Sequence, residues 1–345
     1  MSFSYKKAGV DIQAADAAKT MMKKDLATND KRVLNTVGAF ASLFDARFPD
    51  MEHPVLVLKT EEPGTKQKLA IEHGRIESLC EDMIHHLIND IVVMGATPLS
   101  VQDAIICGKL ERETVNRLVK GIAAACRAQG CVLTGGETSE QPGVLEPGTY
   151  VLTASIVGVV DKSEIIDGRA IRTGDTVIAV ASNGLHTNGY SLVRALLRQE
   201  PALAGETIGG RTFLDAILEP HTCYYQSLKG LFSLRGLHGM AHITGGGMAG
   251  NLNRILPKGT AAAIDLGKIR ALPVFHFIRE HARVSDADML QTYNLGVGLT
   301  IVADPQEQTK IIAHLKKHGH AAYPIGTIVR GGRKVSFAGA LRWKD

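Results

Sequence analysis

Tyr150-Val-Leu-Thr-Ala-Ser-Ile-Val-Gly-Val-Val160 is an apolar, β-branched stretch that predicts a strand. The polar segment Asp161-Lys-Ser-Glu-Ile-Ile-Asp-Gly168 follows it and has the composition of an exposed connector. A further strand is predicted to begin at Asp175-Thr-Val-Ile-Ala-Val-Ala181. The connector therefore divides the chain, and we expect a domain boundary near residues 168–172.

Each half mixes strands with helices. In the first half, the sequence predicts a strand at Val55–Lys59, helices near residues 76–94 and 111–127, and a strand at Cys131–Thr134 that closes on two glycines. In the second half, the strand from Asp175 leads through a Gly/Asn-rich loop into a helix near residue 190. The pattern predicts an α+β (mixed α/β) fold with two domains, 1–170 and 171–345.

Composition narrows the class of protein. Of 345 residues, 45% are hydrophobic and 21% charged, which is typical of a soluble globular chain. The net charge of +4 is spread without a basic cluster, so it favours small anionic substrates over nucleic acid. The five cysteines form no C-x-x-C pair, and neither a signal peptide nor a membrane-spanning run is evident. We expect a cytoplasmic protein without a membrane partner.

Several segments join glycine to carboxylates or hydroxyls directly after a predicted strand. In Glu61-Glu-Pro-Gly-Thr-Lys66, backbone amides and the Lys66 ammonium are suited to holding phosphate oxygens. The spacing is not that of a Walker loop, and a surface turn is the alternative interpretation.

Three aspartates form a candidate magnesium set. Asp82 and Asp90 lie two helical turns apart on one stripe, and Asp103 interrupts the apolar run from Leu99 to Ile106. Magnesium prefers such hard oxygen ligands and often bridges nucleotide phosphates, whereas an unpaired buried carboxylate is costly. The alternative for Asp82 and Asp90 is a solvated helix face.

Three more glycine-containing segments are candidates for ligand binding. Thr134-Gly-Gly-Glu-Thr-Ser-Glu-Gln-Pro-Gly143 allows close approach to the backbone, or is a hairpin turn. Ser182–Gly189 and His242-Ile-Thr-Gly-Gly-Gly247 each precede a predicted helix, where free amides favour a phosphate. Alternatively, Asn188 is a helix N-cap and Gly245–Gly247 a linker.

Taken in order, the motifs resemble those of the phosphoribosylformylglycinamidine cyclo-ligase family over nearly the whole chain. The motifs are Tyr5–Ile12, Gly135–Gly143, His186-Thr-Asn-Gly-Tyr-Ser-Leu-Val-Arg194, His242–Gly247 and Tyr293-Asn-Leu-Gly-Val-Gly298. The resemblance implies a homodimer in which first-domain strands form a shared β-barrel. It also implies ATP and Mg²⁺ as cofactors and a nucleotide as substrate. It further implies that the first domain binds ATP and forms the dimer, and that the second domain closes the active-site cleft. The implied reaction is ATP-dependent ring closure of formylglycinamidine ribonucleotide to aminoimidazole ribonucleotide, in purine synthesis.

The resemblance also implies a role for each candidate residue. Lys66, Asp103 and His186 are assigned to catalysis, with His186 as the proton-transfer group. The magnesium ligands are Asp82, Asp90 and Asp103. The nucleotide set is Glu61, Gly64, Thr65, Lys66, Gly135, Gly136, Glu137 and Thr138. The substrate set is His186, Asn188, His242, Thr244, Gly245, Gly246 and Gly247.

The sequence departs from the family pattern on the nucleotide side. The family's Thr-Asp-Gly-Val-Gly-Thr-Lys is replaced by Thr60-Glu-Glu-Pro-Gly-Thr-Lys66, so Glu62 adds charge and Pro63 lacks an amide donor. A glycine-rich stretch is thinned to Val37-Gly-Ala-Phe40, and His85-His86 replaces smaller or apolar residues. Two other functions therefore stay open: a non-catalytic or regulatory paralogue that binds a purine-pathway nucleotide, and a sister kinase or synthetase with another small acceptor.

Overall fold

The computed structural model describes residues 26–35 and 39–343, and the chain divides into two compact units. The first comprises Met1–Ile91 and Thr97–Lys162, and the second comprises Val92–Ala96 and Ser163–Asp345. The Tyr5–Ile12 motif and two residues of the Val37–Phe40 stretch lie outside the described residues.

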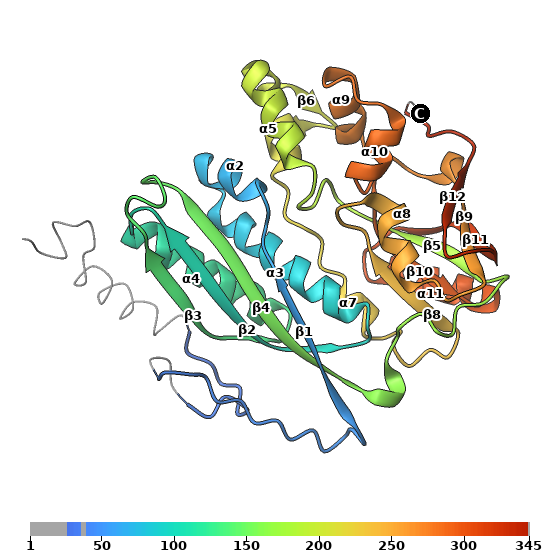
Figure 1. Ribbon diagram of the computed structural model, residues 1–345, viewed down its shortest axis with the longest axis horizontal. Coiled ribbons are helices and arrows are strands. Elements are labelled where there is room, and N and C mark those ends of the chain that lie inside the picture. Colours follow the sequence, from blue (N-terminus) through green and yellow to red (C-terminus); the bar gives the residue numbers. More distant parts are fainter. Residues whose placement is uncertain (1–25, 36–38, 344–345) are drawn as a thin grey trace, which may run out of the picture. The chain divides into compact units, whose positions relative to one another are not determined.

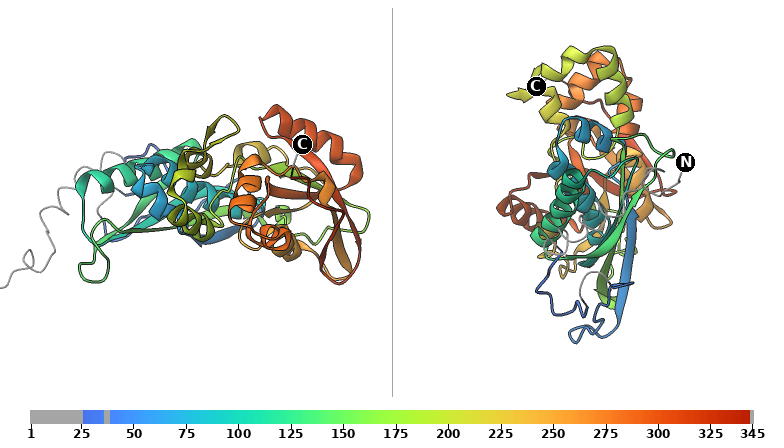
Figure 2. Two further views of the ribbon diagram at one scale, coloured as in Figure 1. Left: turned by 90° about the horizontal axis from the view of Figure 1, so that it is seen from above. Right: turned by 90° about the vertical axis from the view of Figure 1, so that its left-hand side faces the viewer.

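A four-stranded sheet with the order β1-β4-β2-β3 forms the centre of the first unit. Neighbouring strands are antiparallel except β2 and β3, which run parallel. Helices α2, α3 and α4 lie on one side of this sheet (Figure 1, Figure 2). The bounds are β1 (Pro54–Glu61), α2 (Lys66–Glu72), α3 (Ile76–Val92), β2 (Thr97–Cys107), α4 (Arg112–Ala128), β3 (Val132–Glu140) and β4 (Tyr150–Asp161).

The two long helices were predicted in place, but the character of one differs from expectation. In α4, buried Val115, Leu118 and Ile122 follow helical spacing on one face. In α3, the polar stripe is not a solvated face, because Asp82 and Asn89 are both 0% exposed. Periodicity shows which residues share a helix face, but it does not show whether a polar face is buried or exposed to solvent. That depends on the partners of these side chains, which lie elsewhere in the chain.

Strand β3 runs through the segment that was expected to leave the sheet at two glycines. Its backbone pairs in parallel with Gln102–Cys107 of β2 as far as Glu140. Gly136 lies opposite Asp103, and a Cβ at position 136 would stand 1.8 Å from Asp103 Oδ1. The glycine is therefore required by the neighbouring carboxylate, and it does not end the strand.

The second unit contains a six-stranded sheet with the order β12-β9-β11-β5-β10-β8. Its strands are β5 (Thr176–Ala181), β8 (Leu237–His242), β9 (Thr260–Asp265), β10 (Val297–Ala303), β11 (Ala322–Arg330) and β12 (Val335–Ala338), beside a short hairpin of β6 (Thr207–Ile208) and β7 (Arg211–Thr212). Only β12 and β9 pair in parallel within this sheet. Strand β10 is buried along its whole length, as expected for a central strand covered on both faces.

Short helices and loops surround this second sheet. They are α5 (Tyr190–Gln199), α6 (Phe213–Ile217), α7 (Tyr225–Leu228), α8 (Gly247–Leu252), α9 (Pro273–His281), α10 (Asp286–Thr292) and α11 (Gln308–Lys317). Helix α8 packs on β8 and α11 packs on β11. Within residues 26–35 and 39–343, none of the helices has the length and apolar character needed to cross a membrane.

Candidate active site

The loop that carries the altered nucleotide motif joins β1 directly to α2. Strand β1 ends at Glu61, and α2 begins at Lys66 after Gly64, whose φ is +59°. Lys59 Nζ lies 2.6 Å from Glu61 Oε1 and 3.1 Å from Asp90 Oδ2. One lysine thus brings together two carboxylates from sequence segments 29 residues apart. In this loop, Glu62 is exposed and Pro63 is buried.

The predicted phosphate-binding lysine forms an ion pair inside the first unit. Lys66 Nζ donates to Asp82 Oδ1 at 2.7 Å and lies 2.7 Å from Oδ2, and both side chains are 0% exposed. Helix α3 carries Asp82 to the start of α2, where Lys66 is the first residue. The structure therefore couples two residues that the sequence assigned to different roles.

Asp103 is the carboxylate of the predicted magnesium set with the most unusual surroundings. Its Oδ2 atom is buried and accepts no hydrogen bond from the described residues. Burial raises the pKa of Asp103 to about 7 from an ordinary value near 3.8. A divalent cation at this oxygen would compensate the desolvated charge, so the residue fits a magnesium ligand.

The remaining nucleotide-side candidates lie on β3. Glu137 is exposed, Thr138 is half-buried, and both follow Gly135 and Gly136 along the strand that pairs with β2. Because Gly136 lies against Asp103, the structure brings the glycine motif beside one predicted magnesium ligand.

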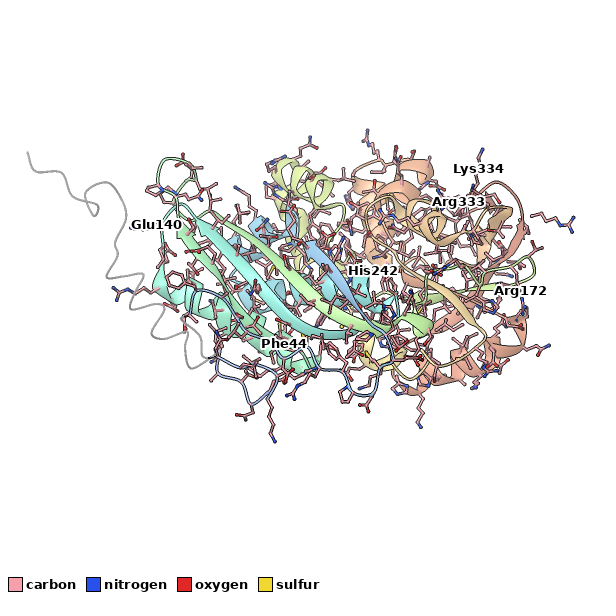
Figure 3. All side chains as sticks on the ribbon, turned by 60° about the horizontal axis from the view of Figure 1, so that its bottom comes forward. Phe44, Glu140, Arg172, His242, Arg333 and Lys334 are labelled. Carbon is pink, nitrogen blue, oxygen red and sulfur yellow. The ribbon has the colours of Figure 1, made fainter. Side chains whose placement is uncertain are left out.

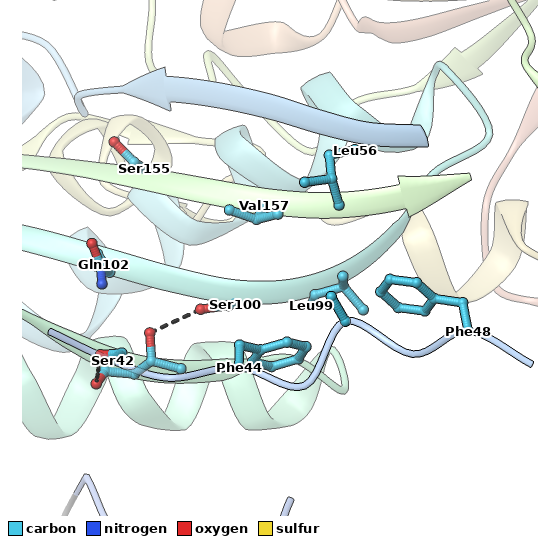
Figure 4. A pocket seen from close by; sticks show the side chains of 11 residues that line it. Ser42, Phe44, Phe48, Leu56, Leu99, Ser100, Gln102, Ser155 and Val157 are labelled. Carbon is cyan, nitrogen blue, oxygen red and sulfur yellow. Dashed lines mark hydrogen bonds between the residues drawn. The ribbon is translucent and has the colours of Figure 1, made fainter. Parts of the chain in front are cut away.

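A partly apolar groove of about 290 Å³ lies in the first unit (Figure 4). Phe44 and Phe48 line it together with Leu56 of β1 and Leu99 of β2. Ser42 ties this segment to the sheet, because its hydroxyl donates to the Thr134 carbonyl at 2.7 Å. The sequence analysis did not predict this groove, since its aromatic residues lie far from any recognised motif.

In the second unit, the loop before α5 holds His186 in an unusual backbone conformation. His186 has φ +62°, a region that non-glycine residues rarely adopt, and its carbonyl accepts from Tyr190 Oη at 3.2 Å. Gly189, at φ +80°, is the N-cap of α5, so the alternative role of Asn188 as N-cap is wrong. A Cβ at Gly189 would stand 2.1 Å from the Tyr293 ring, which brings two of the quoted motifs into contact.

The triple-glycine segment is held by one buried asparagine. Asn251 Nδ2 donates to the carbonyls of Gly247, Gly245 and Thr244, at 2.8, 3.2 and 3.2 Å. Gly245 and Gly246 remain exposed, and a Cβ on Gly245 would be 3.3 Å from Asn188 Oδ1. Two segments assigned to the substrate, 186–189 and 242–247, therefore lie side by side.

His186 and His242 also meet, through a third histidine that the sequence analysis missed. His221 follows Pro220 between α6 and α7, and its ring stacks on His186 with centroids 3.8 Å apart. Its Nε2 lies 2.9 Å from Nε2 of His242. His242, which is labelled in Figure 3, is the last residue of β8. A lone histidine in a segment without glycine or other polar motif gave no signal in the sequence.

Comparison with known proteins finds a matching protein family for each of the two units. A family model for the N-terminal domain of AIR synthase related proteins matches residues 45–160, and one for the C-terminal domain matches residues 172–338. The phosphoribosylformylglycinamidine cyclo-ligase of Bacillus cytotoxicus is 39% identical over 345 residues, which cover 99% of each chain. That of Bacillus mycoides is also 39% identical, over 96% of this chain and 97% of the relative.

Solved structures with lower identity share the fold. The E. coli hydrogenase maturation protein HypE is similar with a TM-score of 0.68 and 16% identity over 94% of each chain. Thiamine-monophosphate kinase from Stenotrophomonas maltophilia has a TM-score of 0.66 and 18% identity, over 96% of this chain and 98% of that one. These similarities confirm the predicted mixed α/β fold with two domains.

Proposed function

Because the chain belongs to the phosphoribosylformylglycinamidine cyclo-ligase family, we propose that it closes the imidazole ring of a purine precursor. The substrate is formylglycinamidine ribonucleotide, and the products are 5-aminoimidazole ribonucleotide, ADP and phosphate. The observation that carries the proposal is 39% identity to cyclo-ligases over 99% of both chains. Alignment over the full length includes both the nucleotide-side and the substrate-side motifs.

The reaction needs a better leaving group than a carbonyl oxygen. The γ-phosphoryl group of ATP moves to the formyl oxygen, and an amidine nitrogen then attacks the formyl carbon. The carbon–oxygen bond breaks, phosphate leaves with the former formyl oxygen, and the nitrogen loses a proton. Little covalent chemistry is left to the protein, so positioning and charge stabilisation by its side chains dominate.

We assign the nucleotide side to the first unit. Glu61, Gly64 and Thr65 form the loop beside the phosphates, and Lys66 supplies positive charge at its end. Gly135 and Gly136 let the nucleotide approach β3, where Glu137 and Thr138 lie next along the strand. The support is the register of the sheet, which sets Glu61 of β1 and Gly136 of β3 in one row across the strands, with Asp103 of β2 between them.

We assign magnesium to the same unit. Asp103 would be a direct ligand, and its buried, raised-pKa carboxyl is the support. Asp82 and Asp90 contact Lys66 and Lys59, so we place them around the ion through water rather than as its first partners. When bound, magnesium would offset the charge of the triphosphate and of the departing phosphate.

We assign the substrate side to the second unit. The exposed residues Gly245 and Gly246, together with Gly247, hold the 5′-phosphate, and Asn188 and Thr244 flank that segment. His186 removes the proton from the attacking nitrogen, since imidazole titrates near neutrality, and His242 orients the substrate. The support is the side-by-side arrangement of segments 186–189 and 242–247.

We further propose that the protein is a homodimer joined through the strands of the first unit. Strand β1 is an edge strand, and its Leu56 and Leu58 are 53% and 69% exposed. An edge strand with large apolar side chains normally pairs or is covered. A second copy of the same sheet would cover both leucines and complete the barrel that the family resemblance implies.

The altered loop favours one second candidate, a paralogue that binds a purine nucleotide without phosphoryl transfer. Glu62 is exposed in this loop, and Pro63 has no amide to donate to a phosphate. Incubation with ATP, Mg²⁺ and formylglycinamidine ribonucleotide separates the two functions. The cyclo-ligase makes ADP and aminoimidazole ribonucleotide together, whereas the paralogue binds nucleotide and makes neither product. A panel of other small acceptors tests for a sister kinase in the same assay.

A further inference from the structure

Tyr293 and Asn294 lie between helix α10 and strand β10 in the second unit. Tyr293 directly follows the last residue of α10, and Asn294 lies shortly before the start of β10. The two residues are 1% and 3% exposed. Neither belongs to the substrate set or to the nucleotide set, but both contact the loop 182–189, which carries part of the proposed substrate site. They are therefore placed to set the geometry of that site.

Asn294 holds the beginning of the loop 182–189. Its Oδ1 accepts hydrogen bonds from Ser182 Oγ at 2.9 Å and from the Gly296 amide at 2.8 Å, and its Nδ2 donates to the Gly184 carbonyl at 2.9 Å. A backbone N–H needs an acceptor and a backbone carbonyl needs a donor, so these two partners fix which side of the Asn294 amide faces each of them. An aspartate has nearly the same shape, but its carboxylate cannot donate to Gly184.

Tyr293 holds the other end of the same loop. Its hydroxyl donates to the Gly189 carbonyl at 3.2 Å, and its ring contacts that of Phe275 on α9, with centroids 5.6 Å apart. The Gly189 carbonyl also accepts from the Val193 amide at 3.3 Å, so it keeps one partner when the tyrosine hydroxyl is removed. Tyr293→Phe is therefore a mild change, which we expect the fold to tolerate.

The same part of the chain also contacts the glycine segment assigned to the 5′-phosphate. A Cβ at Gly247 would stand 1.9 Å from the Leu290 carbonyl oxygen and 3.4 Å from that of Tyr293, so the backbones lie against each other. Helix α10 also packs on α8, which begins at Gly247. Residues 290–294 thus contact both segments of the proposed substrate site.

We propose that Tyr293 and Asn294 are positioning residues for the substrate, which keep the loop 182–189 and the segment 245–247 at the spacing that binds the ribonucleotide. The inference rests on the proposed function, because that function assigns both segments to the nucleotide substrate. The two side chains act through the loop that carries His186, and a small displacement of positioned groups can be costly. Both residues belong to the second unit, so ATP binding by the first unit should not change.

Substrate binding by full-length variants tests the proposal. Calorimetry measures the dissociation constant of formylglycinamidine ribonucleotide in the presence of Mg²⁺ and a non-hydrolysable ATP analogue, whose own dissociation constant is measured separately. We expect Tyr293→Phe to raise the constant for the substrate about 2- to 10-fold, the range of one hydrogen bond, and to leave that for the analogue unchanged. Asn294→Asp sets a charged oxygen against the Gly184 carbonyl in place of a donor, so its effect should be larger.

Tyr323→Phe is the matched control, because it also removes a buried tyrosine hydroxyl from the second unit. The Tyr323 hydroxyl accepts from the Arg270 amide at 3.3 Å, and that partner lies on neither substrate segment. We expect this variant to bind the substrate as the parent does. A change that only lowers the amount of folded protein reduces the apparent kcat but leaves the dissociation constant unaltered, so the two effects are separable.

A folded Tyr293→Phe protein, checked by circular dichroism, that keeps the parent's dissociation constant for the substrate would overturn the proposal. An equal loss of affinity for the ATP analogue, or the same loss in Tyr323→Phe, would overturn it too. Turnover by the parent tests the proposed function separately. A parent that binds the substrate, shows the Tyr293→Phe effect and makes no imidazole contradicts the ligase function and supports the positioning role. A parent that does not bind the substrate contradicts both.

Discussion

Lys66 and Asp82 form a fully buried ion pair, with the ammonium nitrogen 2.7 Å from both carboxylate oxygens. Removing one member of such a pair leaves a buried charge without its main partner, which typically costs about 3–5 kcal/mol. We expect Lys66→Met to lower the free energy of unfolding by about that amount. Urea denaturation of the parent and the variant measures the change.

Two controls separate the buried pair from general effects on α2. Lys68→Met removes an exposed lysine that lies 3.6 Å from Glu72 on the same helix, and should cost less than about 1 kcal/mol. Adding Asp82→Leu to Lys66→Met should recover much of the lost stability, because no buried charge remains. Strictly additive losses in the double variant would show that the pair is not coupled.

The raised pKa of the Asp103 carboxyl should give the protein an unusual dependence of folding stability on pH. Its pKa is about 7 in the folded protein and near 3.8 in an unfolded chain, so the folded state binds the extra proton between these values. The parent is therefore progressively destabilised as pH rises from about 4 to 7, by up to about 4 kcal/mol. Asp103→Asn lacks this penalty.

The measurement is urea denaturation of both proteins without divalent cations, at pH 5 and at pH 8. We expect the free energy of unfolding of Asp103→Asn, minus that of the parent, to be larger at pH 8 than at pH 5. A difference between the two proteins that is independent of pH would mean that the carboxyl is not strained by burial.

The same substitution should remove magnesium-dependent turnover. An amide oxygen carries no charge to attract the ion, so the folded Asp103→Asn protein is expected to lose most of its ligase activity at saturating ATP. The measurement is ADP release against magnesium concentration. Near-normal turnover would remove Asp103 from the catalytic site.

The loop before α2 offers a test that should improve function. Two like charges about 4 Å apart repel by up to roughly 4 kcal/mol at an effective dielectric near 20, and Glu62 lies in the loop assigned to the triphosphate. Replacing Glu62 with Gly and Pro63 with Val removes that charge and restores an amide donor. We expect a lower KM for ATP and little change in KM for the substrate.

Glu72→Gln, an exposed change at the far end of α2, controls for net charge and should leave both constants unchanged. Weaker ATP binding by the double variant would instead assign Glu62 a favourable contact, such as a bound cation.

Exposed Leu58 provides the test of assembly. We expect the parent to sediment as a dimer, and Leu58→Lys to dissociate it, because a charge at a covered apolar edge costs its desolvation. Val144→Lys changes a side chain that is 75% exposed outside the strands and should leave the dimer intact. A parent that is monomeric and active at low concentration rules out the shared barrel.

Much of the fold could be predicted from local pattern. The apolar run at Tyr150–Val160 became β4, and the helices predicted at 76–94 and 111–127 were confirmed as α3 and α4 within two residues at either end. The family was also predicted, because its motifs are short and ordered along the chain, and relatives aligned over 99% of it confirm the resemblance. The extension of β3 was missed, because pairing with β2 is a long-range property.

Less of the candidate site could be predicted from the sequence, because its contacts are also long-range. Residue type predicted Asp103 as a magnesium ligand, and the family resemblance implied roles for His186 and His242, but the side chains that contact these residues come from elsewhere in the sequence. Neither the Lys66–Asp82 pair nor the position of His221 between the other two histidines has a local signature. Such pairs are set by how strands and loops assemble, and only the folded chain reveals them.

Transfer of the formyl oxygen to phosphate tests the central claim most directly. Formylglycinamidine ribonucleotide labelled with ¹⁸O in the formyl group is incubated with the protein, ATP and Mg²⁺, and the released phosphate is analysed by mass spectrometry. A cyclo-ligase that phosphorylates the formyl oxygen gives one ¹⁸O per phosphate, with ADP and aminoimidazole ribonucleotide in equal amounts. Phosphate without label, or ADP without the imidazole product, would contradict the account.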